Sequence, residues 1–511
     1  MNEASKENFL RGFAPKSLLI ANAIMTVVYF IVLTFFFPHQ HPILFTLLVL
    51  GEIFHMWQVF TFIWTIWEPD YSHRKDDSFT PGVDVFITVA GEPVDIVRET
   101  ILAARAMKYP NFKIYILNDG FVAKKANWDE IVKLTRSLGV GCITRRTPGG
   151  AKAGNINNGL HLTKNPFVVV FDADHVPHPD FLTKMIPYFV DSTVGYVQSP
   201  QYYKNYATNI ITQSAWEQQQ LFFGAICRGK NRFHSVTMAG TNMAIRRKAL
   251  EQVGGMCTES IAEDFATGMF MHEQGWKSVY VSEVLAEGLA PEDFKTYYNQ
   301  QYRWARGALD ILFQYDLLFR KKLSWHYKLQ YLSSVTFFFS GAVVMLNALL
   351  PLIFFFTGMV PLEVSTATLA AVFIPYIFLT IYTLQRSSNY TFTFGAVAFS
   401  MSSFAIHLNA ITAALLGRKS GFVISSKKKL SGNFIHLAVP HITYTLLVIV
   451  GITYGVSRDG FSPSIMNNIA WALFNVAVFT PFIYAASEGS IRALVPKQAV
   501  EPVTVAFRAD Q

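Results

Sequence analysis

Two pairs of carboxylates in the middle of the chain have the spacing that metal binding and proton transfer need. Asp172 and Asp174 are separated by one residue and follow an apolar, β-branched run, whereas Glu263 and Asp264 are adjacent. Carboxylates spaced like the first pair suit Mg²⁺ or Mn²⁺ that also binds a substrate diphosphate. A carboxylate of the second pair can act as a general base. Either pair alone is also explained by local structure, because acidic residues are common in turns and in the first turn of helices.

Three further segments carry groups that could contact a phosphate or a sugar. Residues 149–155 (GGAKAGN) are rich in glycine and contain Lys152, but they lack the GK[ST] of a Walker loop. Asp119 precedes a glycine after an apolar run, and such a pair alone most often marks a turn. Residues 300–304 (QQYRW) place an amide, a guanidinium and an indole on a predicted helix, which alone also fits an amphipathic helix near a membrane: Gln300, Arg303 and Trp304.

The apolar runs around these residues predict alternating strands and helices. Strands are expected at 83–89, 113–117 and 167–171, and helices at 94–107 and 128–137. This alternation predicts βαβ units and a parallel sheet, in which ligands bind at the carboxyl ends of the strands. The polar residues that follow the predicted strands are therefore candidate ligand contacts: Glu92, Asp119, Asp172 and Asp174.

Composition indicates a membrane protein with one charged region, from about Asp70 to Arg320. The 511 residues are 51% hydrophobic and 15% charged, and the long apolar segments lie near the two ends. The net charge of +8 comes largely from basic residues beside apolar segments, as the positive-inside rule expects. No basic and aromatic platform accompanies this charge, so nucleic-acid binding is not expected. The three cysteines show no CxxC spacing, which argues against structural zinc and fits a reducing cytosol.

Seven segments have the roughly 20 apolar residues that a membrane-spanning helix needs: 17–37, 42–66, 330–356, 363–385, 391–416, 434–456 and 466–486. The first is too long for a signal-peptide core and has no cleavage site after it, so we expect a permanent membrane helix. The linkers 38–41 and 358–363 contain no Lys or Arg and are predicted to be external. Because the cation-rich segment 418–429 is predicted to be cytosolic, 391–416 is expected to be interfacial or re-entrant beside six crossings. A seventh span with Arg418 outside remains the alternative.

Taken in order, the polar segments resemble processive family 2 glycosyltransferases, the group that contains cellulose, chitin and hyaluronan synthases. The segments that carry the resemblance are Asp119-Gly120, Lys152-Ala-Gly-Asn155, Asp172-x-Asp174, Gly240-Thr241-Asn242, Glu263-Asp264 and Gln300-x-x-Arg303-Trp304. The cellulose-synthase branch is the most similar, through residues 152–157, 197–200 and 240–247. Residues 422–427 (FVISSK) resemble the gating loop of that branch, which follows an interfacial helix.

Three positions depart from the pattern of the family. Asn118 replaces the first Asp of the usual Asp-Asp-Gly, although Asp119 matches the position that contacts the base. Ala262 replaces the Thr of Thr-Glu-Asp, and Ala239 stands where cellulose synthases often have Cys. The last two changes put the geometry of the acceptor, and so the linkage, in doubt. About 25 residues follow the last predicted span, too few for a fused cyclic-di-GMP-binding domain.

The resemblance implies a GT-A type α/β domain, with a mostly parallel sheet, inserted between membrane helices. We expect a two-span segment at 1–70, a cytosolic glycosyltransferase domain at 71–310 and a membrane block at 311–490. The block would include interfacial helices and a gating loop at 417–430, and a cytosolic tail would follow at 491–511.

The resemblance also implies a role for each candidate residue in an inverting transfer from a UDP-sugar. Asp264, beside Glu263, would be the general base, and Asp172 and Asp174 would hold Mg²⁺ or Mn²⁺. Residues implied to bind the nucleotide-sugar are Glu92, Asp119, Lys152, Gln300 and Arg303. Those implied for the acceptor are Trp304, Gly240 and Thr241, and those for the gating loop are Phe422, Ser425 and Lys427.

The implied product is a β-glucan made processively from UDP-glucose and secreted through the enzyme's own channel in the plasma (inner) membrane. Its linkage would be β-1,4, or β-1,3 or mixed, because Ala239 and Ala262 leave more room for the acceptor. The expected partners are the UDP-sugar, the growing polysaccharide, the lipid bilayer and accessory secretion subunits. The alternatives are a chitin- or hyaluronan-type synthase with an N-acetylated donor, and a non-processive lipid-phosphate glycosyltransferase. A transporter is disfavoured, because the spans contain almost no charged residues.

Overall fold

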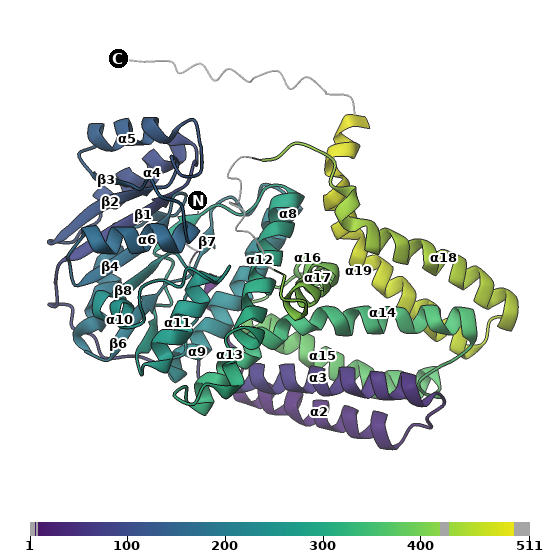
Figure 1. Cartoon of the computed structure of the whole chain (residues 1–511). Coiled ribbons are helices and arrows are strands. Elements are labelled where there is room, and N and C mark those ends of the chain that lie inside the picture. The colour runs from purple at the N-terminus through teal and green to yellow at the C-terminus, as the bar shows by residue number, and fades with distance from the viewer. Residues whose placement is uncertain (1–5, 7–8, 419–428, 495–511) are drawn as a thin grey trace, which may run out of the picture.

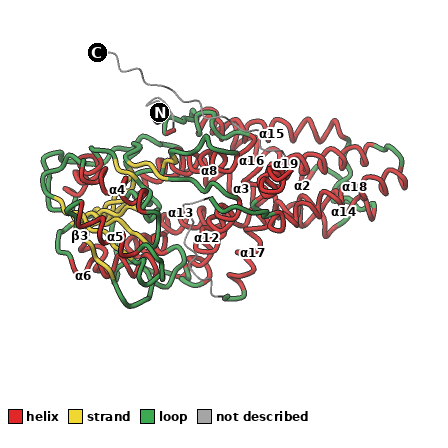
Figure 2. The backbone as a smooth tube through the Cα atoms, turned by 90° about the horizontal axis from the view of Figure 1, so that it is seen from above, coloured by secondary structure: helices red, strands yellow, loops and turns green. Residues whose placement is uncertain are grey.

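An α/β domain lies at one end of a bundle of long helices in the computed structural model (Figure 1). The structure describes residues 6, 9–418 and 429–494. Seen from above, the strands gather at one end of the molecule and the bundle extends away from them (Figure 2). This arrangement confirms the prediction of an α/β domain flanked by helices that are long and apolar enough to cross a membrane.

The α/β domain is built on a seven-stranded sheet in the order β3-β2-β1-β4-β8-β6-β9. Neighbouring strands from β3 to β4 are parallel, β8 is antiparallel to both of its neighbours, and β6 and β9 are parallel. The sheet is therefore mostly parallel, as predicted. Its strands are β1 (Val83–Val89), β2 (Phe112–Asn118), β3 (Gly141–Thr144), β4 (Phe167–Asp172), β6 (Val194–Gln198), β8 (Met243–Arg246) and β9 (Lys277–Tyr280). A small second sheet contains β5 (Val176–Pro177), β7 (Tyr202–Tyr203) and β10 (Ala286–Gly288).

The central strand β1 is buried along its whole length, because helices cover both faces of the sheet. Its odd-numbered valines and Ile87 pack with α4 (Val94–Arg105) and α5 (Trp128–Ser137), whereas Phe86 packs with α6 (Ala151–Leu162). In the register of the sheet, Thr88 pairs with Asp172 and Val89 with Asn118. The polar residues that follow β1, β2 and β4 therefore meet at one edge of the sheet.

Two longer helices complete the part of the α/β domain that faces this edge. α11 (Glu263–Glu273) begins with the acidic pair, and α12 (Phe294–Phe313) carries the QQYRW segment. Asp293 caps α12, since its Oδ1 accepts a hydrogen bond from Thr296 N at 2.8 Å. The remaining helices of this region are α7 (Phe181–Met185), α8 (Ile210–Gln220), α9 (Arg228–Lys230), α10 (Arg247–Gln252), η1 (Ile186–Val190), the π-helix η2 (Leu221–Cys227), η3 (Asn231–Phe233) and η4 (Leu317–Phe319).

Among the described residues, the bundle contains seven segments that are long and apolar enough to cross a membrane by length and composition. One of them, Phe394–Leu415, is divided at Ser403 into two helices of 9 and 12 residues that lie across the direction of the others in both views (Figures 1 and 2). At about 1.5 Å per residue, neither helix reaches across a hydrocarbon core of about 30 Å. The helices of the bundle are α2 (Lys16–Phe35), α3 (Pro42–Ile66), α13 (Trp325–Thr336), η5 (Phe337–Phe339), α14 (Ser340–Thr357), α15 (Thr366–Ser387), α16 (Phe394–Ser402), α17 (Phe404–Leu415), η6 (Ile435–Ala438), α18 (Val439–Asp459) and α19 (Pro463–Leu494).

Contacts between the loops show which helix ends share a side of the bundle. The two linkers predicted to be external pair with each other through a bridge between His39 and Leu362. At the other end, Gly12 lies against the end of α15, where an added Cβ would be 1.9 Å from the carbonyl oxygen of Ser387. The chain before α18 also lies on the side of the α/β domain, since Leu430 N donates to the Oδ2 of Asp293 at 3.1 Å.

These contacts place both ends of the α16–α17 segment on one side of the bundle, since the chain leaves α15 and enters α18 on that side. This arrangement fits the interfacial placement predicted for 391–416. The number of crossings stays a prediction, because Phe394–Leu415 is also long and apolar enough to span a membrane. The three residues predicted for the gating loop, Phe422, Ser425 and Lys427, lie outside the described residues.

Candidate active site

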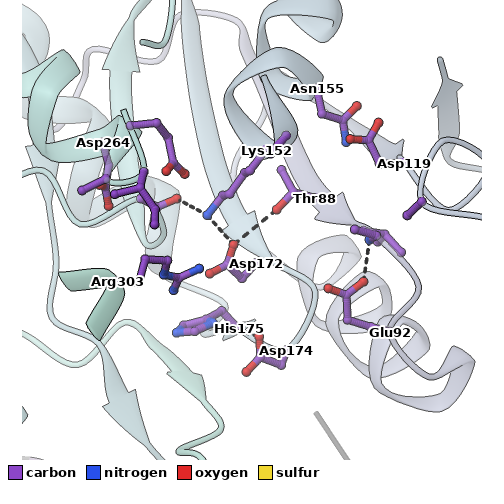
Figure 3. A pocket seen from close by; sticks show the side chains of 18 of the residues that line it. Thr88, Glu92, Asp119, Lys152, Asn155, Asp172, Asp174, His175, Asp264 and Arg303 are labelled. Atoms are coloured by element: carbon purple, nitrogen blue, oxygen red, sulfur yellow. Dashed lines mark hydrogen bonds and ion pairs between the residues drawn. The ribbon is translucent and has the colours of Figure 1, made fainter. Parts of the chain in front are cut away.

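A cavity of about 400 Å³ lies at the edge of the sheet where β1, β2 and β4 end, between α6, α11 and α12. Its volume is in the range of ligand sites. The cavity is lined by Glu92 and by residues from all six motif segments of the sequence analysis: Asp119, Lys152, Asp172, Asp174, Gly240, Glu263, Asp264, Gln300, Arg303 and Trp304. Asp119 and Glu92 lie on one side of Lys152 and Asp172, and Asp264 and Arg303 lie on the other (Figure 3).

Of the three residues predicted to bind the acceptor, Gly240 and Trp304 line the cavity. Thr241 is not among the described residues that line it. Its side chain is fully buried, and its Oγ1 accepts a hydrogen bond from the backbone N–H of Asp172 at 3.0 Å. Thr88 Oγ1 also lies 3.3 Å from Asp172 Oδ1. Thr241 and Thr88 therefore position Asp172 at the end of β4.

Lys152 connects the acidic groups of the cavity to one another. It lies in the first turn of α6, and its ammonium group forms an ion pair with Asp172 and donates to the carbonyl oxygen of Gly240 at 2.8 Å (Figure 3). Burial alone would lower the pKa of Lys152, but the carboxylates of Asp172, Glu263 and Asp264 outweigh it and raise that pKa. Lys152 is therefore held as a cation in the centre of the cavity.

Asp172, Asp174 and His175 form a group whose potential ligand atoms all lie within 4.8 Å of one another. The His175 ring is 4% exposed, and neither of its nitrogens has a hydrogen-bond partner among the described residues. The ring lies so close to Gly288 that a Cβ there would be 2.5 Å from Nε2. Two carboxylates and an imidazole nitrogen suit a divalent cation such as Mn²⁺ or Mg²⁺. The residues present therefore fit the predicted metal, and His175 joins the two predicted ligands.

Glu263 and Asp264 face the cavity from the first turn of α11. Asp264 Oδ1 accepts a hydrogen bond from Phe265 N at 2.8 Å, and a Cβ at Gly240 would lie 2.7 Å from Oδ2. Gly240 has a φ of +76°, so both its conformation and its contact with Asp264 require glycine. Burial raises the pKa of Asp264, while Lys152 and Arg303 oppose the shift. Burial and the adjacent Asp264 also raise the pKa of Glu263.

Arg145, like His175, is a residue of this site that the sequence analysis missed. Its guanidinium binds Asp119 with two hydrogen bonds, Nε to Oδ1 and Nη2 to Oδ2, each of 2.6 Å. It also donates to the carbonyl oxygens of Gly149 and Ala151, which precede Lys152. Arg145 follows β3, so the rule that polar residues after strands are candidates would have found it. The four residues of β3 were too short a run for the strand to be predicted.

The QQYRW segment reaches the cavity through helical spacing. Gln300, Arg303 and Trp304 are three and four residues apart on α12, so they project from one face towards the cavity. The same helix packs against α17 of the bundle. One element therefore joins the cavity to the membrane block.

Comparison with known proteins identifies both halves of this arrangement. Residues 81–307 match the model of glycosyltransferase-like family 2, and residues 251–388 match the model of cellulose synthase. The first match covers the sheet and the cavity, and the second runs from the end of α10 to the end of α15.

Among curated proteins, the cellulose synthase catalytic subunit [UDP-forming] of Pseudomonas fluorescens is 27% identical over 469 residues, which cover 88% of this chain and 62% of that protein. The catalytic subunit of Xanthomonas axonopodis pv. citri is 32% identical over 58% of this chain and 40% of its own length. Putative cellulose synthase 2 of Komagataeibacter xylinus is 30% identical over an alignment that covers 75% of this chain and 26% of that protein. The chain thus spans from about a quarter to three fifths of the length of these relatives.

Among solved structures, a mannosyltransferase from Pyrobaculum calidifontis in complex with GDP-Man and Mn²⁺ aligns with 79% of this chain and 100% of its own, at 16% identity and a TM-score of 0.49. That score is too low to support an inference about this chain. The two family matches and the curated relatives agree with the motif order read from the sequence. The chain therefore belongs to the family 2 glycosyltransferases, in the cellulose synthase-like branch.

Proposed function

We propose that the protein transfers glucose processively from UDP-glucose to a growing β-glucan and passes the polymer through its own helices. The observation that supports this most is the single cavity in which a metal-type acidic group, a buried carboxylate and the α12 motif meet beside the bundle. The curated relatives that the chain matches are named as UDP-forming cellulose synthases. We place the enzyme in the plasma (inner) membrane, with the α/β domain in the cytosol, following the distribution of basic residues.

In this proposal Asp264 takes the proton of the attacking acceptor hydroxyl. Its burial raises its pKa, which makes it a better proton acceptor than an exposed carboxylate, provided that it is ionised. Lys152 and Arg303 line the same cavity and would stabilise the charge that develops on the leaving diphosphate. A divalent cation held by Asp172, Asp174 and His175 would supply further charge stabilisation on that diphosphate.

The opposite end of the cavity would hold the uridine. Asp119 is fixed there by Arg145, and the Oε2 of Glu92 accepts a hydrogen bond from Ala90 N at 2.6 Å. A carboxylate held in this way can accept the imide N–H of uracil without reorganising. Because Arg145 also binds the turn before Lys152, it would keep the contacts to base and to phosphate in register.

The acceptor would lie beside Trp304, on the wall formed by Gly240 and Ala239. The expectation that Ala262 adds space there stays a prediction, and Ala262 lines the cavity together with Ala239. The Cβ of Ala262 also packs against α12, since a Cβ at Gly307 would lie only 2.3 Å from it. The small side chain at position 262 therefore also serves the contact between α11 and α12. We keep β-1,4 as the proposed linkage, with β-1,3 or mixed linkage as the alternative.

The donor and the linkage are tested by incubating the purified protein in lipid nanodiscs with single UDP-sugars. UDP-glucose alone should yield a polymer that a β-1,4-specific glucanase digests. If only a β-1,3-specific glucanase digests the polymer, the linkage is β-1,3 instead of β-1,4. A polymer made only from UDP-N-acetylglucosamine would identify a chitin-type synthase, and single-sugar transfer to a lipid phosphate would contradict processivity.

Replacing Asp264 by Asn should lower the rate of polymer formation by a factor of about 10² to 10⁴, because a general base is lost. The affinity for UDP, measured by isothermal titration calorimetry, should stay within about threefold, because the amide keeps the shape of the carboxylate. Asp129→Asn, an exposed carboxylate in the first turn of α5, serves as the control. Polymer formation at a near-normal rate by Asp264→Asn would rule out this base.

Replacing Asp174 by Ala should lower activity by roughly a hundredfold or more, because a metal ligand and its charge stabilisation are lost. Excess Mg²⁺ or Mn²⁺ should not restore it. Binding of Mn²⁺ to the purified protein, followed by electron paramagnetic resonance without any donor, should weaken in the same variant and in His175→Ala. Full activity of the native enzyme in excess EDTA would contradict a metal role for Asp172, Asp174 and His175.

Replacing Arg145 by Leu should weaken UDP binding by roughly ten- to a hundredfold, because two charge-assisted hydrogen bonds that fix Asp119 are removed. Arg146→Leu is the matched control, since it removes the same group from an adjacent, exposed position. Calorimetry with UDP and CDP gives a second measurement, in which the Arg145 variant should lose discrimination between the two bases. Equal affinities of the two variants for UDP would show that Arg145 does not position the donor site.

A further inference from the structure

The segment between α12 and α13 presents large apolar side chains to the outside of the molecule. Leu317 and Leu323 are buried and anchor this segment, with exposed fractions of 0% and 2%. Between them, Leu318 and Phe319 are 49% and 80% exposed. An apolar side chain as large as Phe319 is unfavourable in water at that exposure. The segment therefore has one face anchored in the protein and one apolar face without cover from the described residues.

The protein holds this exposed face in a fixed position. Arg320 donates from Nε to the carbonyl oxygen of Tyr315 at 2.7 Å, and its guanidinium forms an ion pair with Glu273. Lys328 Nζ donates to the carbonyl oxygen of Leu318 at 2.9 Å. Because Glu273 is the last residue of α11 and Lys328 lies in α13, the segment is fixed to both the α/β domain and the bundle. Phe319 is thus displayed by a loop that its neighbours hold in place.

Basic and aromatic residues lie beside the exposed apolar ones. Lys321 and Lys322 are exposed, and the exposed fraction of Trp325 is 68%. Trp325 also begins a segment, Trp325–Thr357, that is long and apolar enough to cross a membrane. Its ring lies 6.4 Å from that of Trp64 at an interplanar angle of 18°, near the end of α3. We call Leu318, Phe319, Lys321, Lys322 and Trp325 the η4 patch, and it adjoins the ends of two candidate spans.

The chemistry and the place of the η4 patch point to one occupant. At the ends of spans the surroundings are the headgroup layer, where Trp is enriched and a Phe can enter the boundary of the acyl chains. Lysines at this level attract the phosphates of anionic lipids. We propose that the η4 patch docks on the bilayer surface on the side of the α/β domain and binds anionic phospholipid headgroups. A soluble protein partner fits less well, because the patch is continuous with the ends of two helices of the bundle.

This docking would couple the bilayer to the cavity through α11. The helix begins at Glu263 and Asp264 and ends at Glu273, which binds Arg320 of the same segment. A lipid surface held at the η4 patch would therefore keep the α/β domain seated against the membrane. The inference depends on the position and chemistry of the patch and not on the proposed reaction.

The depth of the patch can be measured in nanodiscs that contain phosphatidylcholine and phosphatidylglycerol. A nitroxide is attached to Phe319→Cys in a chain whose three native cysteines are replaced by alanine. The same label at Leu162→Cys, an exposed apolar position at the end of α6, is the control. At position 319 the nitroxide should collide more often with O₂ than with a water-soluble nickel chelate. At position 162 it should collide more often with the chelate. Equal access of the chelate to both positions would overturn the proposal.

The headgroup contact is tested with a fluorescent short-chain phosphatidylglycerol and the full chain in zwitterionic detergent, by anisotropy. Lys321→Gln combined with Lys322→Gln should lower the affinity by roughly twentyfold, since each lysine near an anionic lipid surface contributes about a factor of five. Lys108→Gln with Lys113→Gln, two exposed lysines of the α/β domain, should leave it within twofold. Phe319→Ser should weaken binding, whereas Leu162→Ser should not.

Three outcomes would overturn the proposal. The first is an equal loss of lipid affinity in the Lys321/Lys322 and Lys108/Lys113 variants, and the second is no loss of affinity in the Lys321/Lys322 variant. The third is competition by glycerol 1-phosphate that is as strong as competition by the unlabelled lipid. The last would indicate a site for a free phosphate instead of a bilayer surface. The thermal stability of each variant, measured in the same detergent, separates a change in binding from misfolding.

Discussion

Several carboxylates gather around one ammonium group in the cavity of this protein, and much of the surrounding structure serves to hold that group in place. Asp172, Glu263 and Asp264 all raise the pKa of Lys152, which is partly buried among them. Like charges at such separation repel, so the arrangement needs a central cation in the absence of a substrate. Lys152 provides this cation. A bound diphosphate and its metal ion would change the balance of charge between Lys152 and the carboxylates.

The position of Lys152 depends in turn on backbone geometry and on Arg145. Gly149 and Gly150 have φ values of 147° and 64°, so the chain can turn sharply into α6 and place Lys152 in its first turn. Arg145 holds this turn through the carbonyl oxygens of Gly149 and Ala151 and holds Asp119 with the same guanidinium. One side chain therefore connects Asp119, at one end of the cavity, to the turn that carries Lys152. A displacement of Asp119 would shift Arg145 and, through it, that turn.

The helix α12 makes the cavity and the membrane block parts of one structure. Its middle carries Gln300, Arg303 and Trp304 at the cavity, and it packs closely against α17 of the bundle. The contact between Ala262 and Gly307 lets α11 approach α12, which brings the acidic pair next to this motif. If the chain makes a polymer that crosses the membrane, α12 joins the site of bond formation to the helices of the bundle.

The sequence by itself determined the elements whose signals are local. Strands such as Val83–Val89 and Phe167–Asp172, the spans, and the polar residues that follow strands could all be read from short runs of residues. The order of the motifs was sufficient to identify the family, because each motif needs only a few adjacent residues. The basic residues beside the apolar runs also gave an expected parity of the spans, which stays a prediction.

Only the tertiary structure decided which residues meet across long distances in the chain. Lys152 reaches Gly240, 88 residues away, and Arg145 reaches Asp119, 26 residues away. Packing between elements also buries Thr241 behind Asp172. The same kind of packing brings Ala262 into contact with Gly307. Such contacts have no local signal, because the packing of side chains from separate elements fixes them and no periodicity of the sequence records that packing. The sequence thus named the chemical groups, and the fold determined which of them act together.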